Sequence, residues 1–138
     1  MARAQVLVVE DENIISMQIR DMLKAMGYSV CGMASSGQEA IDKAKETRPD
    51  LVLMDVILMG TMDGIEAAGH ICASLNVPVI FLTGCADDET SERARKIGPF
   101  AYVTKPFTER ELGSAIKMTL QKHTTEGRGK DQEKAGIT

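Results

Sequence analysis

Chemically reactive side chains follow several short apolar runs of this 138-residue chain. Glu10 and Asp11 come directly after Val-Leu-Val-Val, and Asp55 is the last residue of Leu-Val-Leu-Met-Asp. Thr83 closes Val-Ile-Phe-Leu-Thr, and Lys105 follows Ala-Tyr-Val-Thr. Three carboxylates that share a partly buried cleft need a cation or protons to offset their repulsion. Carboxylate oxygens suit Mg²⁺ and Mn²⁺, so a divalent metal site is predicted if the acidic residues meet in space.

A carboxylate nucleophile, a divalent cation, a lysine and a hydroxyl together suit phosphoryl transfer to an aspartate. In that reaction the protein mainly positions groups and neutralises charge on the transferring oxygens. Asp55 is the expected nucleophile and would form an aspartyl phosphate. Taken singly, each residue has a plainer interpretation: the acidic pair fits a solvated turn or a helix N-cap, and Lys105 an ordinary surface lysine. The combination favours the site.

The elements that must position these residues alternate along the chain. The apolar runs predict strands over residues 5–9, 28–34, 51–55, 79–82 and 101–103. Ile15, Ile19, Met22 and Met26 recur at helical spacing after the first strand. Gly27 follows where a left-handed residue is wanted, so the helix is expected to end there.

Four further helices are expected between and after the strands. Ser36–Glu39 and Thr108–Glu111 have the form of a capping box, so a helix starts at each. A third helix carries Ile65 and Ala68 on its apolar stripe. A polar helix capped by Asp87 or Asp88 reaches Ile97; its main apolar anchors are Ala94 and Ile97, so we expect it to be loosely held.

Five strands that alternate with five helices predict an α/β fold with helices on both faces of a parallel sheet. Right-handed crossovers then limit the topology to a doubly wound sheet. We expect the flavodoxin-like (βα)5 arrangement and take 2-1-3-4-5 as its strand order. In such sheets the functional site lies outside the carboxyl ends of the strands. The first and third strands are neighbours in this order, so Glu10, Asp11 and Asp55 are expected to converge, with Lys105 on the far side.

Composition limits the classes of protein. A net charge of -4 argues against direct nucleic-acid binding, and no apolar run approaches the roughly 18 residues of a membrane span. Three scattered cysteines fit reduced thiols, and the first residues lack a signal peptide's apolar core, so a cytoplasmic protein is expected. We expect one domain over residues 1–122 and a disordered C-terminal tail or linker over residues 123–138.

The chain resembles the receiver domains of response regulators in two-component signalling, such as the chemotaxis regulators. The resemblance covers about residues 5–122. It rests on four segments that stand in the family's order and spacing: Val-Leu-Val-Val-Glu10-Asp11-Glu12, Asp50-Leu-Val-Leu-Met-Asp55, Phe-Leu-Thr83-Gly84 and Lys105-Pro106-Phe107. Any one of these segments alone would be weak evidence, whereas together they are specific.

The resemblance implies that Asp55 accepts a phosphoryl group from the phosphohistidine of a histidine kinase or phosphotransfer protein. Asp11 and Asp55 would bind Mg²⁺ directly, Glu10 would help through water, and the main-chain carbonyl of Ile57 would be another ligand. Lys105 would pair with the phosphoryl group. Thr83 would donate a hydrogen bond to it. The domain would turn over only its own phosphate, so it is a signalling domain and not an enzyme that acts on external substrates.

The resemblance also implies how the signal leaves the site. Tyr102 matches the family's aromatic switch position, although half-buried packing on an edge strand also explains an aromatic residue there. The expected order of events is that Thr83 moves toward the phosphoryl group, Tyr102 fills the vacated space and the fourth helix rearranges. The face made by the fourth helix, fifth strand and fifth helix would then bind a downstream output domain or protein, and homodimer formation is left open. The Lys105–Pro106 peptide bond is expected to be cis.

The loop after Asp55 departs from the common pattern. Met59 stands where the family usually has proline, and Asp63-Gly64 comes one residue late, which predicts a longer loop. Two other functions remain as alternatives on this fold, a flavodoxin-like nucleotide or flavin binder and a phosphorylation-independent interaction module. The acidic segment after the first strand would repel a phosphate ester, which disfavours the first. The complete set of reactive residues disfavours the second.

Overall fold

The computed structural model describes residues 3–58, 60–84, 88–96 and 100–122. Within these residues five parallel strands form one sheet in the order β2-β1-β3-β4-β5. The strands are β1 (Gln5–Val9), β2 (Ser29–Ala34), β3 (Leu51–Asp55), β4 (Val79–Thr83) and β5 (Phe100–Thr104). The predicted α/β fold and strand order are confirmed. The boundaries differ slightly, because β2 starts one residue later than expected, β4 includes Thr83, and β5 is one residue longer at each end.

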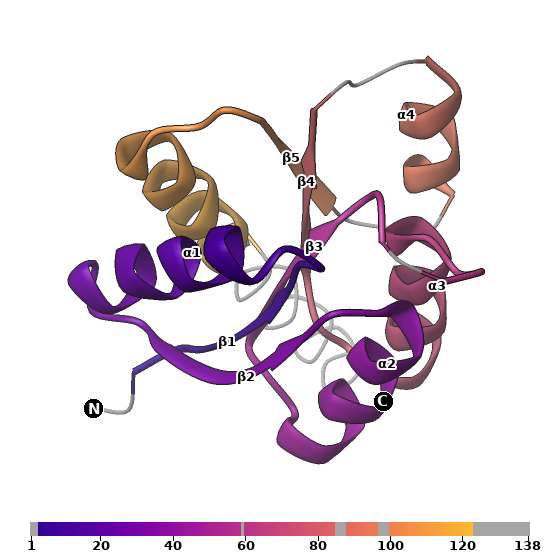
Figure 1. The fold of residues 1–138 in the computed structure, drawn as a ribbon, viewed down its shortest axis with the longest axis horizontal. Coiled ribbons are helices and arrows are strands. Elements are labelled where there is room, and N and C mark those ends of the chain that lie inside the picture. The colour runs from indigo at the N-terminus through magenta and orange to yellow at the C-terminus, as the bar shows by residue number, and fades with distance from the viewer. Residues whose placement is uncertain (1–2, 59, 85–87, 97–99, 123–138) are drawn as a thin grey trace, which may run out of the picture.

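Helices cover both faces of the sheet, as Figure 1 shows. They are α1 (Asn13–Ala25), α2 (Gly37–Thr47), α3 (Gly64–Ser74), α4 (Asp88–Arg95) and a last helix over residues 109–122. The α1 helix and the last helix pack on one face, and α2, α3 and α4 lie on the other. No helix in the described residues has both the length and the apolar character to cross a membrane.

The three central strands are buried except for the half-buried Gln5 at the start of β1, which is why they form nearly continuous apolar runs in the sequence. Along β1, Leu7 and Val9 face the α2–α3 layer, while Val6 and Val8 face α1 and the last helix. The sheet therefore separates two apolar cores. The polar residues at the carboxyl ends of its parallel strands lie together at one edge of the sheet.

Local signals in the sequence set the helix boundaries. Gly27 has φ 90°, so it takes the left-handed conformation that ends α1. At the start of α2, the Glu39 N–H donates to Ser36 Oγ at 3.2 Å, but the Glu39 carboxylate accepts from the Ser35 N–H at 2.8 Å and not from Ser36. The second capping box is complete: Thr108 and Glu111 exchange two bonds of 3.1 Å.

Four predictions rest on residues outside the described ones: the expected tail over residues 123–138, Met59 in the loop after Asp55, and the two ends of the polar helix at Asp87 and Ile97. The described part of this helix is α4, where Ala94 is fully buried.

Candidate functional site

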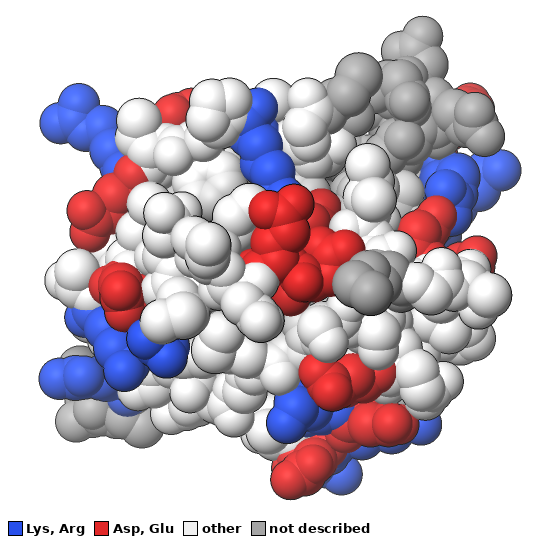
Figure 2. Space-filling model, viewed as in Figure 1, with Lys and Arg blue, Asp and Glu red and all other residues white. Residues whose placement is uncertain are grey.

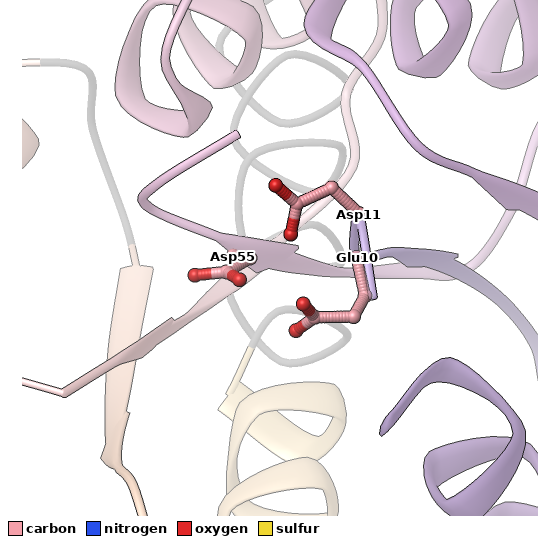
Figure 3. Close-up of side chains that lie close together, drawn as sticks. All are labelled: Glu10, Asp11 and Asp55. Carbon is pink, nitrogen blue, oxygen red and sulfur yellow. The ribbon is translucent and has the colours of Figure 1, made fainter. Parts of the chain in front are cut away.

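The pairing of β1 with β3 brings the three carboxylates together. Val9 lies opposite Met54 in the parallel register, so the residues that follow each, Glu10 and Asp55, leave the sheet side by side. One carboxylate oxygen from each of Glu10, Asp11 and Asp55 lies within 4.8 Å of the others. Figure 3 shows the three side chains directed toward a common space at the ends of these strands. Glu10 and Asp55 are buried, with 2% and 6% of their surfaces exposed, and Asp11 is half-buried.

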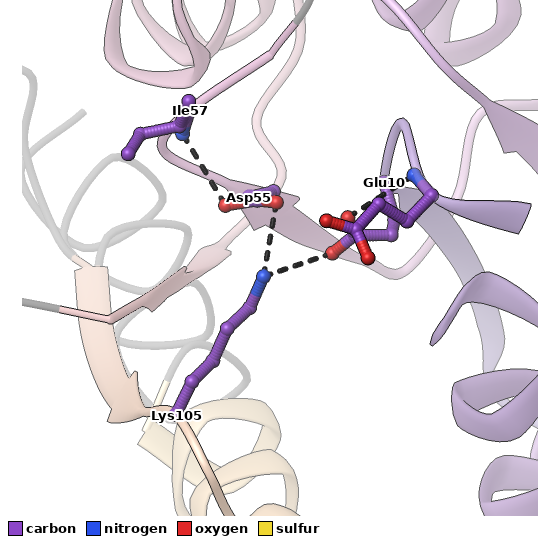
Figure 4. A network of polar contacts seen from close by, with 5 residues as sticks. Glu10, Asp55, Ile57 and Lys105 are labelled. Carbon is purple, nitrogen blue, oxygen red and sulfur yellow. Dashed lines mark hydrogen bonds and ion pairs between the residues drawn. The ribbon is translucent and has the colours of Figure 1, made fainter. Parts of the chain in front are cut away.

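Lys105 reaches this cluster from the end of β5. Its Nζ lies 3.0 Å from Asp55 Oδ2 and 3.1 Å from Glu10 Oε2, and Figure 4 shows the ammonium group between the two carboxylates. The main-chain N–H of Lys105 donates to the Thr83 carbonyl at 2.8 Å, which ties the start of this segment to β4. The Lys105–Pro106 peptide bond is cis.

The loop after β3 passes close to the Asp55 side chain. The Ile57 N–H donates to Asp55 Oδ1 at 3.2 Å, while the Ile57 side chain is 75% exposed. Val56 and Leu58 on either side are buried, so they anchor the loop. The main chain of Ile57 is therefore held next to the carboxylate cluster.

Thr83 and Tyr102 lie on the strands beyond Asp55. Leu82 is opposite Asp55 in the β3–β4 register, so Thr83 extends one residue farther toward the site edge, and it is 4% exposed. Tyr102 is half-buried and lies opposite Phe81, with ring centroids 6.0 Å apart. The two proposed switch residues thus occupy neighbouring strands. Tyr102 lies farther from the site edge than Thr83, because it pairs with Phe81.

Crowding of these charges changes their proton affinities. Burial, followed by the neighbouring Asp55 carboxylate, raises the pKa of Glu10 to about 7, although Lys105 opposes this shift. Burial alone would lower the pKa of Lys105, but its contacts with Asp55 and Glu10 outweigh that effect, so the Lys105 pKa lies above its ordinary value. The cluster carries more negative charge than one ammonium group balances comfortably, which favours a further cation.

The chemistry of the donor set fits Mg²⁺. The potential ligands are hard carboxylate oxygens from two adjacent strands, and the ion prefers such oxygens together with retained waters. Figure 2 shows a compact acidic patch at the centre of this face, with a basic side chain against its upper edge and mostly uncharged surface elsewhere around it. Because this patch is reached from solvent, both a hydrated ion and a phosphoryl donor could approach it.

Sequence reasoning missed two features beside the site. A Cβ atom on Gly64 would lie 2.0 Å from the main-chain oxygen of Asp55, so only glycine fits there without movement of the backbone. In addition, Arg93 of α4 makes an ion pair of 2.8 Å with Asp63. The displaced Asp-Gly pair was the available signal in the sequence, but its contacts require the packed structure.

Comparisons with known proteins give one consistent result. The family model for the response regulator receiver domain matches residues 6–117. The transcriptional regulatory protein PdtaR of Mycobacterium tuberculosis is 41% identical over 118 residues, which are 86% of this chain and 57% of that protein. This chain therefore spans little more than half the length of that curated relative.

Solved structures agree with the family match. The signal receiver domain of a modulated diguanylate cyclase from Desulfovibrio desulfuricans G20 has a TM-score of 0.84 and 38% identity, over 91% of this chain and 99% of that one. The chemotaxis protein CheY4 of Vibrio cholerae has a TM-score of 0.79 and 28% identity, over 86% and 99% of the two chains. The alternative of a flavin or nucleotide binder is not favoured.

Proposed function

Because the chain belongs to the response-regulator receiver family of two-component signalling, we propose that Asp55 is its phosphoacceptor and that the reaction depends on Mg²⁺. One observation supports this proposal most: Lys105 Nζ lies within 3.1 Å of both Asp55 and Glu10. An ammonium group fixed beside a buried carboxylate can neutralise charge on a phosphoryl group bonded to that carboxylate.

The metal would be held by residues that the structure has already brought together. Asp11 and Asp55 would be direct ligands, with the main-chain carbonyl of Ile57 as a third, and Glu10 would act through water. Mn²⁺ fits the same oxygen donors. Bound there, the divalent ion would supply positive charge against the carboxylates and the phosphoryl oxygens.

The proposed step is a transfer between two nucleophiles. An Asp55 carboxylate oxygen forms a bond to phosphorus while the phosphorus–nitrogen bond of the donor's phosphohistidine breaks, and its electron pair returns to the imidazole nitrogen. The product is an acyl phosphate on Asp55. Lys105 stays paired with the new phosphoryl group and the Thr83 hydroxyl donates to it. Water later hydrolyses this acyl phosphate, so the domain turns over only its own phosphate.

Signal output would then use the elements on the side of β4 away from β3, which include β5 and α4. The phosphoryl group draws Thr83 toward it, Tyr102 moves inward and α4 changes position, which shifts the population between two conformations. A histidine kinase or phosphotransfer protein would be the donor. A downstream output domain or protein would read the face of α4, β5 and the last helix. The name of the relative, a transcriptional regulatory protein, supports an output of some kind. The signalling role and the scattered cysteines support a cytoplasmic location, and residues 1–122 are the proposed receiver unit.

Incubation with acetyl phosphate and Mg²⁺, followed by intact-mass measurement, tests the phosphoacceptor directly. The wild-type chain should gain one phosphoryl group, and EDTA should prevent the gain. Asp55→Asn should gain none while it keeps the circular dichroism spectrum of the folded protein. Asp50→Asn is the matched control, because Asp50 lies exposed at the other end of the same strand and should not affect labelling. Labelling of Asp55→Asn at the wild-type level would refute the assignment.

A further inference from the structure

The loop between β3 and α3 returns to the main chain of the proposed phosphoacceptor. The Gly64 N–H donates to the Val56 carbonyl at 2.8 Å, so the loop closes on the residue next to Asp55. A Cβ on Gly64 would also come within 2.9 Å of the Asp55 carbonyl carbon. The first residue of α3 therefore packs on the Asp55 backbone with no room for a side chain, and the Gly64–Val56 hydrogen bond joins the two segments.

Asp63, the residue before this contact, uses both carboxylate oxygens. Its Oδ1 accepts from the Glu66 N–H at 2.9 Å and caps α3. Its Oδ2 lies 2.8 Å from Arg93 Nη2, which comes from α4. Figure 1 shows α4 beside the start of α3. A short connection thus runs from Asp55 through Gly64 and Asp63 to Arg93.

We propose that Asp63 and Arg93 are positioning residues that restrain the phosphorylation of Asp55. Their ion pair holds α4 against the loop between β3 and α3 in the unphosphorylated conformation. This inference rests on the proposed function. The connection does not pass through Thr83 and Tyr102, so it is a second link between the phosphoacceptor and α4. A conformation in which α4 moves away from the loop loses this ion pair.

The exposure of the pair determines how large its effect should be. The Arg93 and Asp63 side chains are 39% and 33% exposed, and ion pairs of this kind contribute modestly in water. Loss of the pair should raise the population of the alternative conformation, and with it the initial rate of labelling by acetyl phosphate, about two- to fivefold. Screening by salt should reduce the difference.

Four variants isolate the ion pair from its other roles. Arg93→Gln removes the cation, and Asp63→Asn removes the anion but keeps a residue that caps helices equally well. Each should accelerate labelling by a similar factor at saturating Mg²⁺. The double variant should be no faster than either single one, since both changes remove the same interaction. Arg95→Gln, an exposed arginine on the same helix, is the matched control and should label at the wild-type rate.

The outcomes separate this inference from the proposed function. If the wild type is labelled and Asp55→Asn is not, but Arg93→Gln and Asp63→Asn match the wild type, the ion pair has no positioning role. Slower labelling in both variants, or additive effects in the double variant, would also overturn the inference. If no wild-type labelling occurs, the proposed function itself fails. In 1 M salt, where charges are screened over about 3 Å, the rates of the variants and the wild type should converge.

Discussion

The helices α3 and α4, which both adjoin the loop between β3 and α3, are anchored very differently. The α3 helix has 11 residues, an Asp63 cap and a buried side that includes Ile65, Ala68 and Ile71. The α4 helix has eight residues, and Ala94 is the buried one among those whose side chains the structure describes. Both lie on the same face of the sheet, but α3 connects the central strands β3 and β4, whereas α4 connects β4 to the edge strand β5.

This contrast separates the chemistry from the proposed output. The carboxylates extend from β1 and β3, which are buried apart from Gln5 and packed against α1, α2 and α3, so the positions of the carboxylates are held by the core. A helix with few apolar contacts opens or shifts at low cost, which is what a switching element needs. On the proposed function, the domain would combine a rigid site with a weakly held reporter helix, α4, and four changes test this division.

The largest expected effect is on the rigid side. Ile71 is 1% exposed in α3, and replacing it with alanine should lower the free energy of unfolding by roughly 2–5 kcal/mol through lost burial and a cavity. Urea denaturation should show one cooperative transition with a lower midpoint. His70→Ala on the exposed side of the same helix should change stability by less than about 0.5 kcal/mol. Equal effects of the two variants would mean that α3 is not part of the core.

Glu10 should make the rigid site sensitive to pH when no metal is bound. Its pKa is about 7 in the folded protein and near the usual 4.5 when unfolded, so the folded state binds the proton more tightly. The stabilisation is fully present below pH 4.5 and is lost as pH rises through 7, a change on the order of 2–3 kcal/mol. Urea denaturation in EDTA between pH 5 and 8 measures it.

The matched variant for this pH effect is Glu10→Gln, which cannot titrate. The difference in stability between the variant and the wild type should grow in favour of the variant as pH rises. A constant difference across this pH range would show that Glu10 does not carry the shifted pKa.

Gly64 tests how tightly α3 is joined to Asp55, the proposed phosphoacceptor. Alanine would place its Cβ 2.0 Å from the Asp55 oxygen, and because that oxygen belongs to the backbone, relief requires movement of β3 or α3. We expect Gly64→Ala to cost about 1–3 kcal/mol and to slow acetyl-phosphate labelling. Gly113→Ala is the control, since its Cβ would meet only the flexible end of Met26, at 2.8 Å from Sδ, and the last helix gains a better helix former. Normal labelling of Gly64→Ala would show that the contact does not position Asp55.

How far the sequence predicts this molecule depends on the range of each interaction. Apolar runs, Gly27 and the capping boxes act locally, so the helices and strands followed from them, whereas the strand order came from the rules of doubly wound sheets. The meeting of Glu10, Asp11 and Asp55 followed from topology alone, because the carboxyl ends of neighbouring parallel strands share one edge. The contact of Lys105 with Glu10, the fit of Gly64 on Asp55 and the Asp63–Arg93 pair depend on side-chain packing between distant segments, which no local pattern encodes.

The smallest expected effect is also the most selective for the contrast between the helices. Ala68 in α3 and Ala94 in α4 are both fully buried, and glycine at either site costs about 1 kcal/mol in helix propensity. If α4 opens independently of the sheet and is already open at the urea midpoint, Ala94→Gly should speed amide hydrogen exchange within α4 about fivefold and leave the urea midpoint nearly unchanged. Ala68→Gly should instead lower the midpoint of the whole domain. If both variants lower the midpoint equally, α4 unfolds together with the core, and a weakly held reporter helix no longer accounts for the signal.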